Sequence, residues 1–446
     1  MEVLYLNPIF EARSNHRYDT ADYERIDPLL GDEEDFRALV AAAEAEGISI
    51  VLDAVLSHTG DDSRYFNANG AYDAVGAAQG PASPFYDWYD FSEQPDGKPY
   101  RGWWGHMSLP EVDEHDPAWQ RYALGWDGGA GLADGSAGVL QKWLSAGARG
   151  YRLDVADELP DDVLERLRTC VKWAKGDAAI IGEVWEDPTV KVSYGVPRTY
   201  ALGRSLDSVM NYPLRTALIG FALGTLDAHQ LAAFLRLQQA NYPAPMCACL
   251  MNLLSSHDVE RLRSVLALGG PLKQLPRDGQ RAAVQAISPE QDGRGAQLQR
   301  MLAAFLYALP GMPCIYYGDE RGLQGGGDPF CRATFPWEGE GACVRTDVGA
   351  DLTAFYQQIG QMRKESPVLR TGEAVYAAPD DDVVCVVRFD RATDACVVAA
   401  ANRAAEERTV ALDFRSPDLD APEPPGCVQG LLEISVPAHS TVLFEK

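Results

Sequence analysis

Short apolar runs alternate with helical patterns over most of the chain. Runs of strand length lie at residues 3–7, 48–54, 150–155, 179–184, 208–211, 250–254 and 313–317. Helices are predicted where apolar residues recur at intervals of three and four, at residues 32–46, 138–146, 161–174 and 297–309. Alternation of this kind is typical of a parallel sheet covered by helices, so the pattern predicts an α/β fold.

Two segments interrupt this alternation. Residues 59–116 are rich in Gly, Pro, Tyr and Trp, which predicts an insertion after the second run. We expect most of its aromatic side chains to form the core of an irregular domain that has few aliphatic residues. These aromatic residues are Phe85, Tyr86, Trp88, Tyr89, Trp103 and Trp104. From about residue 371 the pattern changes to the β-type runs VVCVVRF, ACVVAAAN, RTVALDF and STVLFE, which predict an all-β domain over residues 371–446.

Length and charge limit the possible classes of protein. A chain of 446 residues exceeds a barrel domain of about 250 residues, so we expect more than one domain. The chain has 39 Lys and Arg against 65 Asp and Glu, a net charge of −26, which argues against nucleic acid or an anionic membrane as a partner. The start MEVLYLNPIF lacks the pattern of a signal peptide, and a cytoplasmic location is expected.

The nine cysteines are an odd number and have apolar neighbours, as at Cys170, Cys314 and Cys385. This pattern predicts reduced thiols that act as small hydrophobic side chains. Cys247 and Cys249 form a C-x-C sequence, but no second pair follows at a spacing typical of zinc sites, so no metal is expected there.

Three carboxylates each lie at the end of a predicted strand. They are Asp154 in GYRLDVAD, Glu183 in AAIIGEVW and Asp258 in CLMNLLSSHD. Strand ends converge on one face of a parallel barrel, so these residues can form one site. Arg152 precedes Asp154 by two positions and shares its face of the strand. Glycoside hydrolysis uses a pair of carboxyl groups as nucleophile and acid/base, and a third carboxylate can stabilise its oxocarbenium-like transition state. The three carboxylates therefore indicate this chemistry.

Ordered motifs along the whole chain resemble one family. They are SNHRYDTADY at 14–23, DAVLSH at 53–58, LPEVD at 109–113, GYRLDVADE at 150–158, GEVW at 182–185, SSHD at 255–258 and YYGDE at 316–320. Together they resemble the α-amylase superfamily, glycoside hydrolase family 13, nearest to its neopullulanase, cyclomaltodextrinase and amylopullulanase branch. The resemblance implies a (β/α)₈ TIM barrel with a domain B inserted at about 59–116 and a C-terminal antiparallel β-sandwich.

The resemblance also implies that the barrel is incomplete. The run at residues 3–7 matches the second strand of the family, so the first strand and helix, and the N-terminal β domain usual in this branch, are expected to be missing. We therefore expect a catalytic domain over residues 1–370 that is truncated at its N-terminus, with unpaired strand edges.

Residue roles follow from the resemblance, position by position. Asp154 would be the nucleophile, Glu183 the general acid/base and Asp258 the transition-state stabiliser. Substrate-binding roles fall to Tyr18 as an aromatic platform, Asp53 as a support of the pocket, Arg152 as the residue that orients the nucleophile, His58 and His257 as donors to the sugar, and Asp328 and Arg332 as the pair that binds the next glucose.

The mechanism implied is that of a retaining α-glucan hydrolase acting by double displacement. Its substrates would be maltooligosaccharides, cyclodextrins, pullulan or starch, cleaved at α-1,4 bonds, with α-1,6 bonds left open. Glu183 must hold a proton while Asp154 stays ionised, a split that Arg152 could enforce. Ser57 stands where many family members have the Asn that binds calcium, so no cofactor is expected and the calcium site is predicted to be lost.

Other function classes stay open at this point. A metal-dependent hydrolase could use His58 and His257 as ligands, although Arg152 would oppose a bound cation. A truncated chain could be a catalytically impaired carbohydrate-binding protein. A transglycosylase or isomerase would share the first half-reaction, because only the acceptor differs. The carbohydrate-binding protein and the transglycosylase or isomerase would both have an α-glucan as their partner. The sequence does not fix the oligomeric state.

Overall fold

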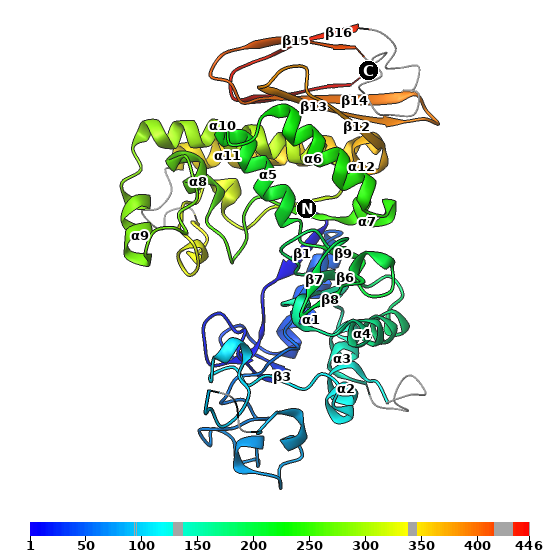
Figure 1. Cartoon of the computed structure of the whole chain (residues 1–446), viewed down its shortest axis with the longest axis vertical. Helices are drawn as coiled ribbons and strands as arrows, with labels where there is room; N and C mark the ends of the chain where they lie inside the picture. Colours follow the sequence, from blue (N-terminus) through cyan, green and yellow to red (C-terminus); the bar gives the residue numbers. More distant parts are fainter. Residues whose placement is uncertain (93, 95, 128–136, 338–345, 414–430, 446) are drawn as a thin grey trace. The chain divides into compact units, whose positions relative to one another are not determined.

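The computed structural model describes residues 1–92, 94, 96–127, 137–337, 346–413 and 431–445. The chain folds as two units, Met1–Val209 and Met210–Lys446 (Figure 1). The predicted division near residue 370 stays a prediction. Within the described residues no helix combines the length and the apolar character needed to cross a membrane.

The first unit is built on a five-stranded parallel sheet in the order β1-β4-β5-β6-β9. These strands are β1 Val3–Leu6, β4 Ser49–Ala54, β5 Gly150–Leu153, β6 Ala179–Gly182 and β9 Ser208–Val209. Each coincides with a predicted run, and their order in the sheet follows their order in the chain, as in the (β/α) units that were expected. In the register of β4 and β5, Asp53 lies beside Arg152.

Helices connect these strands. The periodicity predicts α1 Glu33–Ala45, α3 Val139–Ser145 and α4 Asp161–Ala174, whereas α2 Pro117–Leu124 was not predicted. Helix α1 begins at a capping box, in which the Asp32 side chain accepts from the backbone of Asp35 and the Asp35 side chain accepts from the backbone of Asp32. Its apolar face buries Phe36 and Val40.

The insertion at residues 59–116 contains three short 3₁₀ helices in its described part, η1 Ala77–Gln79, η2 Tyr86–Trp88 and η3 Trp103–Gly105. Trp88 and Tyr89 are buried and pack against other aromatic rings, which confirms the predicted aromatic core for these residues. Trp104 differs, because 72% of its side-chain surface is exposed. An antiparallel pair, β2 Phe10–Ala12 and β3 Thr20–Ile26, lies before α1 in the chain.

The second unit begins with helices around a parallel pair, β10 Met251–Leu253 and β11 Met312–Cys314. Its helices are α5 Tyr212–Leu223, α6 Ala228–Asn241, α7 Ala244–Cys249, α8 Leu262–Leu268, α9 Arg277–Gln285, α10 Pro289–Ala308, α11 Thr346–Glu365 and α12 Pro367–Thr371. Strand β10 lies within the predicted run at 250–254, and β11 overlaps the predicted run at 313–317 only at residues 313 and 314. Helix α10 starts eight residues before the predicted start, because a capping box of Ser288 and Gln291 begins it within a polar stretch that hides the periodicity.

The C-terminal strands form two antiparallel sheets, β12-β13-β14-β17 and β15-β16. Their bounds are β12 Glu373–Ala377, β13 Val383–Asp390, β14 Ala395–Asn402, β15 Arg408–Asp413, β16 Leu431–Val436 and β17 Ser440–Glu445. Val387 and Val398 of the larger sheet join one buried cluster with Val410 and Ile434 of the smaller sheet. The predicted β-sandwich is thereby confirmed.

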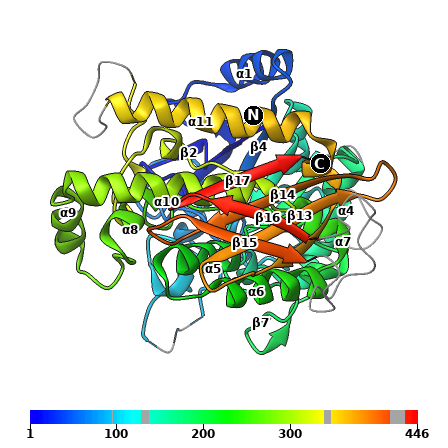
Figure 2. The ribbon, with the colours of Figure 1, turned by 90° about the horizontal axis from the view of Figure 1, so that it is seen from above.

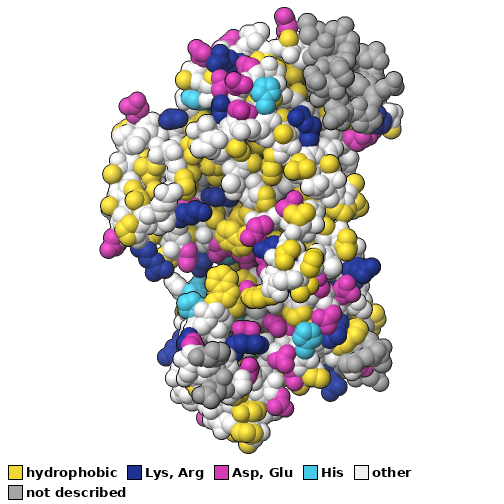
Figure 3. Space-filling view, in the orientation of Figure 1, with side chains coloured by type: hydrophobic (Ala, Val, Ile, Leu, Met, Phe, Trp, Pro, Cys, Tyr) yellow, Lys and Arg dark blue, Asp and Glu magenta, His cyan; other side chains and the backbone are white. Residues whose placement is uncertain are grey.

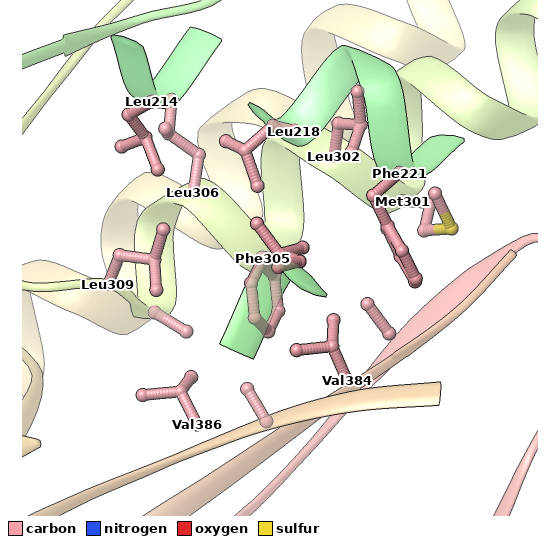
Figure 4. Packing of buried hydrophobic residues seen from close by; sticks show 14 of the residues in the cluster. Leu214, Leu218, Phe221, Met301, Leu302, Phe305, Leu306, Leu309, Val384 and Val386 are labelled. Carbon is pink, nitrogen blue, oxygen red and sulfur yellow. The ribbon is translucent and has the colours of Figure 1, made fainter. Parts of the chain in front are cut away.

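The other face of the larger sheet rests on helices of the same unit. Val384 and Val386 point toward Phe221 of α5 and Phe305 of α10, all in one buried cluster (Figure 4). Figure 2 shows these strands lying across α5 and α10. Alternate residues of β13 therefore face two different cores, which explains why this strand is apolar throughout.

A buried arginine joins this sheet to the helices below it. Arg388 is 1% exposed and donates to the carbonyl oxygens of Ala308 at 2.9 Å, Leu369 at 3.0 Å and Gly372 at 2.7 Å. Burial lowers the pKa of Arg388 to about 10, so it stays charged at neutral pH. The guanidinium therefore satisfies carbonyl groups that would otherwise be buried without donors.

We predict that Arg388→Met lowers the free energy of unfolding by about 3 kcal/mol, because it keeps the apolar stem but leaves buried carbonyl groups without a donor. Urea unfolding followed by circular dichroism measures the change. The matched control is Arg391→Met, which removes an exposed ion pair with Glu373 and should cost less than about 1 kcal/mol. Equal effects of the two substitutions would contradict the anchoring role.

Candidate active site

A fully buried guanidinium joins three carboxylates at the strand ends of the first unit. Arg152, on β5, lies 3.0 Å from Asp53 of β4, 2.8 Å from Asp154 just beyond β5 and 2.9 Å from Glu183 just beyond β6. All four side chains have less than a tenth of their surface exposed. The structure therefore brings together the nucleophile and acid/base predicted from the sequence.

The charges of this cluster do not balance. One guanidinium faces three carboxyl groups, so full ionisation would leave a net charge of −2 on side chains that are almost fully buried. Burial raises the pKa of Asp154 well above its usual range, and the charges of Glu183 and Asp53 add to the rise, although Arg152 opposes it. Burial likewise raises the pKa of Asp53. The cluster therefore favours holding a proton.

Burial raises the pKa of Asp154 and Arg152 opposes that rise. The split expected from the sequence, in which Arg152 keeps Asp154 ionised, stays a prediction. The proton belongs to the cluster as a unit.

Asp53 is held from several sides. Its Oδ2 accepts from the hydroxyl groups of Tyr5 at 2.5 Å and Tyr18 at 2.9 Å, and Arg152 donates to both carboxylate oxygens. Sequence reasoning missed Tyr5. Tyr5 could have been found because it is the one residue with a polar group at its tip in the apolar run VLYL of β1.

His58 is a buried neutral side chain whose two ring nitrogens have protein partners. Its Nε2 lies 3.1 Å from the carbonyl oxygen of Tyr18, and its Nδ1 lies 3.0 Å from the hydroxyl of Ser57. A carbonyl can only accept, so Nε2 carries the proton and Ser57 donates to Nδ1. Burial lowers the pKa of His58 to about 4. In this geometry His58 positions the backbone of Tyr18, whereas its predicted hydrogen bond to sugar stays a prediction.

A strained backbone position next to Asp154, the predicted nucleophile, holds Glu183. Val155 has φ 38° and ψ 56°, a left-handed conformation that a β-branched residue rarely adopts. This conformation lets its backbone N–H donate to Glu183 Oε2 at 2.8 Å. Trp185 Nε1 donates to Glu183 Oε1 at 3.1 Å. Sequence reasoning missed Val155, because the contact depends on a backbone angle that its side chain does not favour.

The second unit brings together the other four predicted residues. Arg332 Nε lies 2.9 Å from Asp328 and donates to the carbonyl oxygen of His257 at 2.9 Å, and its Nη2 lies 3.4 Å from Asp258. His257 Nε2 lies 3.2 Å from Asp258 Oδ2. The predicted pair Asp328 and Arg332 is therefore in contact, and Arg332 also fixes the loop that carries Asp258.

Arg261 stabilises the loop that carries Asp258. It is fully buried and donates to the carbonyl oxygen of Cys331 at 2.8 Å, and it lies 3.2 Å from Asp319. Its guanidinium stacks 3.9 Å from the ring centre of Tyr316. These contacts link the SSHD and YYGDE motifs, so that both segments keep a fixed conformation.

The residues nearest the cluster do not suit a divalent cation. Arg152 occupies the position between the carboxylates that a metal would take, and its charge repels one. The hydroxyl of Ser57, at the position where the resemblance places a calcium ligand, is already engaged by His58. Figure 3 shows Lys and Arg side chains dispersed among acidic ones on the face that it displays.

Comparisons with known proteins bear on this site. The family model described as "Alpha amylase, catalytic domain" matches residues 1–342. An amylopullulanase of Thermoanaerobacterium thermosulfurigenes is 34% identical over 451 residues, covering 93% of this chain and 22% of that protein. Neopullulanase 2 of Thermoactinomyces vulgaris is 31% identical over 415 residues, covering 92% of this chain and 60% of that protein. The chain thus spans less than two thirds of the length of these relatives.

Among solved structures, a cyclic α-maltosyl-(1→6)-maltose hydrolase from Arthrobacter globiformis superposes with a TM-score of 0.77 at 28% identity, covering 100% of this chain and 86% of that chain. These matches confirm the predicted fold class, a (β/α)₈-barrel family with a C-terminal β domain, and the resemblance drawn from the ordered motifs. The chain therefore belongs to the alpha-amylase family of glycoside hydrolases.

Proposed function

We propose that this protein is a retaining α-glucan hydrolase. The observation that carries the proposal is the buried pair of Asp154 and Glu183, which both contact the guanidinium of Arg152. Sharing one guanidinium favours the short carboxyl separation of about 5 to 5.5 Å that double displacement uses, over the separation of about 6.5 to 9.5 Å found in inverting enzymes.

The hydrogen bonds of Glu183 indicate which of its oxygens delivers the proton. Oε2 accepts from the backbone of Val155 and contacts Arg152, so it has two donors. Within the part of the chain that the structure describes, Oε1 accepts from the indole of Trp185. A proton on Oε1 avoids a donor-to-donor conflict at Oε2. In the proposed reaction, Oε1 protonates the glycosidic oxygen while Asp154 attacks the anomeric carbon.

The second half-reaction reverses these roles. Deprotonated Glu183 takes a proton from water, whose oxygen attacks the anomeric carbon and releases Asp154. The two inversions give retention. Asp258, held by His257 and Arg332, acts in the proposal as the carboxylate that stabilises the transition state and grips sugar hydroxyls. That role rests on the family resemblance.

The proposed substrates are maltooligosaccharides, cyclodextrins, pullulan or starch, with cleavage at α-1,4 bonds. The names of the relatives support this choice, because they include amylopullulanase, cyclomaltodextrinase and neopullulanase. Tyr18, whose hydroxyl is fixed by Asp53 and whose backbone is fixed by His58, provides the aromatic face for the sugar at the cleavage point.

We predict that the wild-type chain releases the α-anomer first from maltotriose, as an NMR time course would show. Asp154→Asn should lower kcat/KM by roughly 10⁴-fold or more, because an amide cannot form the glycosyl ester. Burial raises the pKa of Asp154, so its ionisation at pH 7 opposes folding. The neutral Asn should therefore leave the melting temperature unchanged or higher.

The matched control for this experiment is Asp177→Asn, the same change at an exposed carboxylate of the first unit. It should keep full activity. First appearance of the β-anomer would exclude the retaining mechanism, and an active Asp154→Asn protein would exclude this nucleophile.

We also propose that the protein works without calcium. Calcium prefers carboxylate and carbonyl oxygens, whereas Ser57 offers a hydroxyl, held as a donor to His58, at the position where the resemblance places an Asn ligand. EDTA should therefore leave the melting temperature and activity unchanged, since a metal bound only to the native state would stabilise it by mass action. A fall of several degrees that added calcium restores would show that a stabilising site exists.

A further inference from the structure

A row of aromatic rings in contact begins at His58, beside the candidate active site of the first unit. The ring of His58 lies 5.1 Å from that of Trp103, and Trp103 lies 5.0 Å from Trp104 with an angle of 12° between the planes. Trp104 is the exposed end of this row, with 72% of its surface accessible. A single exposed ring is normal on a protein surface, and Trp104 is distinguished by the contacts that hold it in place.

A second exposed ring is tied to the same point. Tyr194 is 74% exposed, and its hydroxyl donates to Glu158 Oε2. Trp104 Nε1 donates to Glu158 Oε1 at 3.0 Å. Glu158 ends the 3₁₀ helix η4 Ala156–Glu158, four residues after Asp154. One carboxylate thus orients two aromatic rings and is connected to the strand end that carries the proposed nucleophile.

Both rings stand on strained backbone. Trp104 has φ 48° and Tyr194 has φ 51°, values that bulky side chains rarely adopt. Tyr194 lies at the turn of a short hairpin, β7 Val192–Ser193 and β8 Val196–Pro197. Ser193 donates to the carbonyl oxygen of Asp157 at 3.2 Å, and Lys191 forms an ion pair with the Asp157 carboxylate at 2.9 Å. The hairpin is therefore fastened beside η4.

The strained backbone, the exposure of the two rings and their fixed positions each cost free energy. Together they hold the aromatic faces of Trp104 and Tyr194 in fixed orientations in contact with water. Fixing the side chains before a ligand arrives reduces the entropy lost on binding. Such an arrangement suits a neutral ligand with flat apolar faces and polar edges.

We propose that Trp104 and Tyr194, held by Glu158, form a subsite for a glucosyl unit of the α-glucan chain away from the bond that is cleaved. The C–H face of the sugar would stack on an aromatic ring. Its hydroxyl groups can donate to Glu158, since a carboxylate has about four acceptor positions and the two aromatic donors use two. The inference rests on the proposed function, because it takes the substrate class from there.

The test compares Trp104→Ala with the wild type on maltotriose and maltoheptaose. The subsite predicts that KM for maltoheptaose rises by about threefold to tenfold while kcat for maltoheptaose changes much less, because the reacting groups are intact. KM for maltotriose should change less than KM for maltoheptaose. Tyr194→Phe, which keeps the ring and removes only its bond to Glu158, should give a smaller rise of the same kind.

Trp173→Ala is the matched control, because Trp173 is 71% exposed in the same unit, on helix α4. It should leave both substrates unaffected. Parallel changes of KM for the two substrates, or none, would overturn the subsite.

A binding measurement separates this inference from the proposed function. In an Asp154→Asn background, maltoheptaose binding is measured by calorimetry with and without Trp104→Ala. Weaker binding in the double variant supports the subsite even if the wild-type chain hydrolyses nothing, which would refute only the function. Unchanged affinity would refute the subsite even if hydrolysis is retaining.

Discussion

The arrangement of the first unit depends on a buried cation that contacts three carboxyl groups. Arg152 has no exposed surface, and a guanidinium in that position would destabilise the fold without paired carboxylates. Asp53, Asp154 and Glu183 come from the ends of three neighbouring strands. The register of the sheet, with Asp53 directly beside Arg152, therefore has to be kept for the charges to meet.

The contact of one guanidinium with three carboxyl groups also favours the proposed proton transfer. A single cation among three carboxylates leaves an excess of negative charge, which favours a retained proton, and proton delivery is what glycoside cleavage requires. The surrounding contacts limit how this cluster can relax. Tyr5 and Tyr18 hold Asp53, while the backbone of Val155 holds Glu183. Stability of the sheet and the proposed catalysis thus rest on one set of interactions.

Sequence reasoning found what is written in local patterns. The strands of the parallel sheet were predictable because each is a short apolar run, and Asp154 and Glu183 were predictable because each follows such a strand. Helix α5 was not predicted, because it is apolar on nearly all sides and shows no helical period. The contact of Val155 with Glu183 and the exposure of Trp104 could not be predicted, because each depends on a left-handed backbone conformation that neither side chain favours.

Exchange of the central arginine for lysine tests the account most directly. Arg152→Lys keeps the charge, but a single ammonium group cannot bridge Asp53, Asp154 and Glu183 as the planar guanidinium does. The account predicts that kcat/KM on maltotriose falls by about a hundredfold or more in a protein that still folds. Arg149 lies three residues earlier in the chain and is partly exposed. Arg149→Lys should therefore keep wild-type kinetics. Full activity of Arg152→Lys would contradict the central role of the bridging guanidinium.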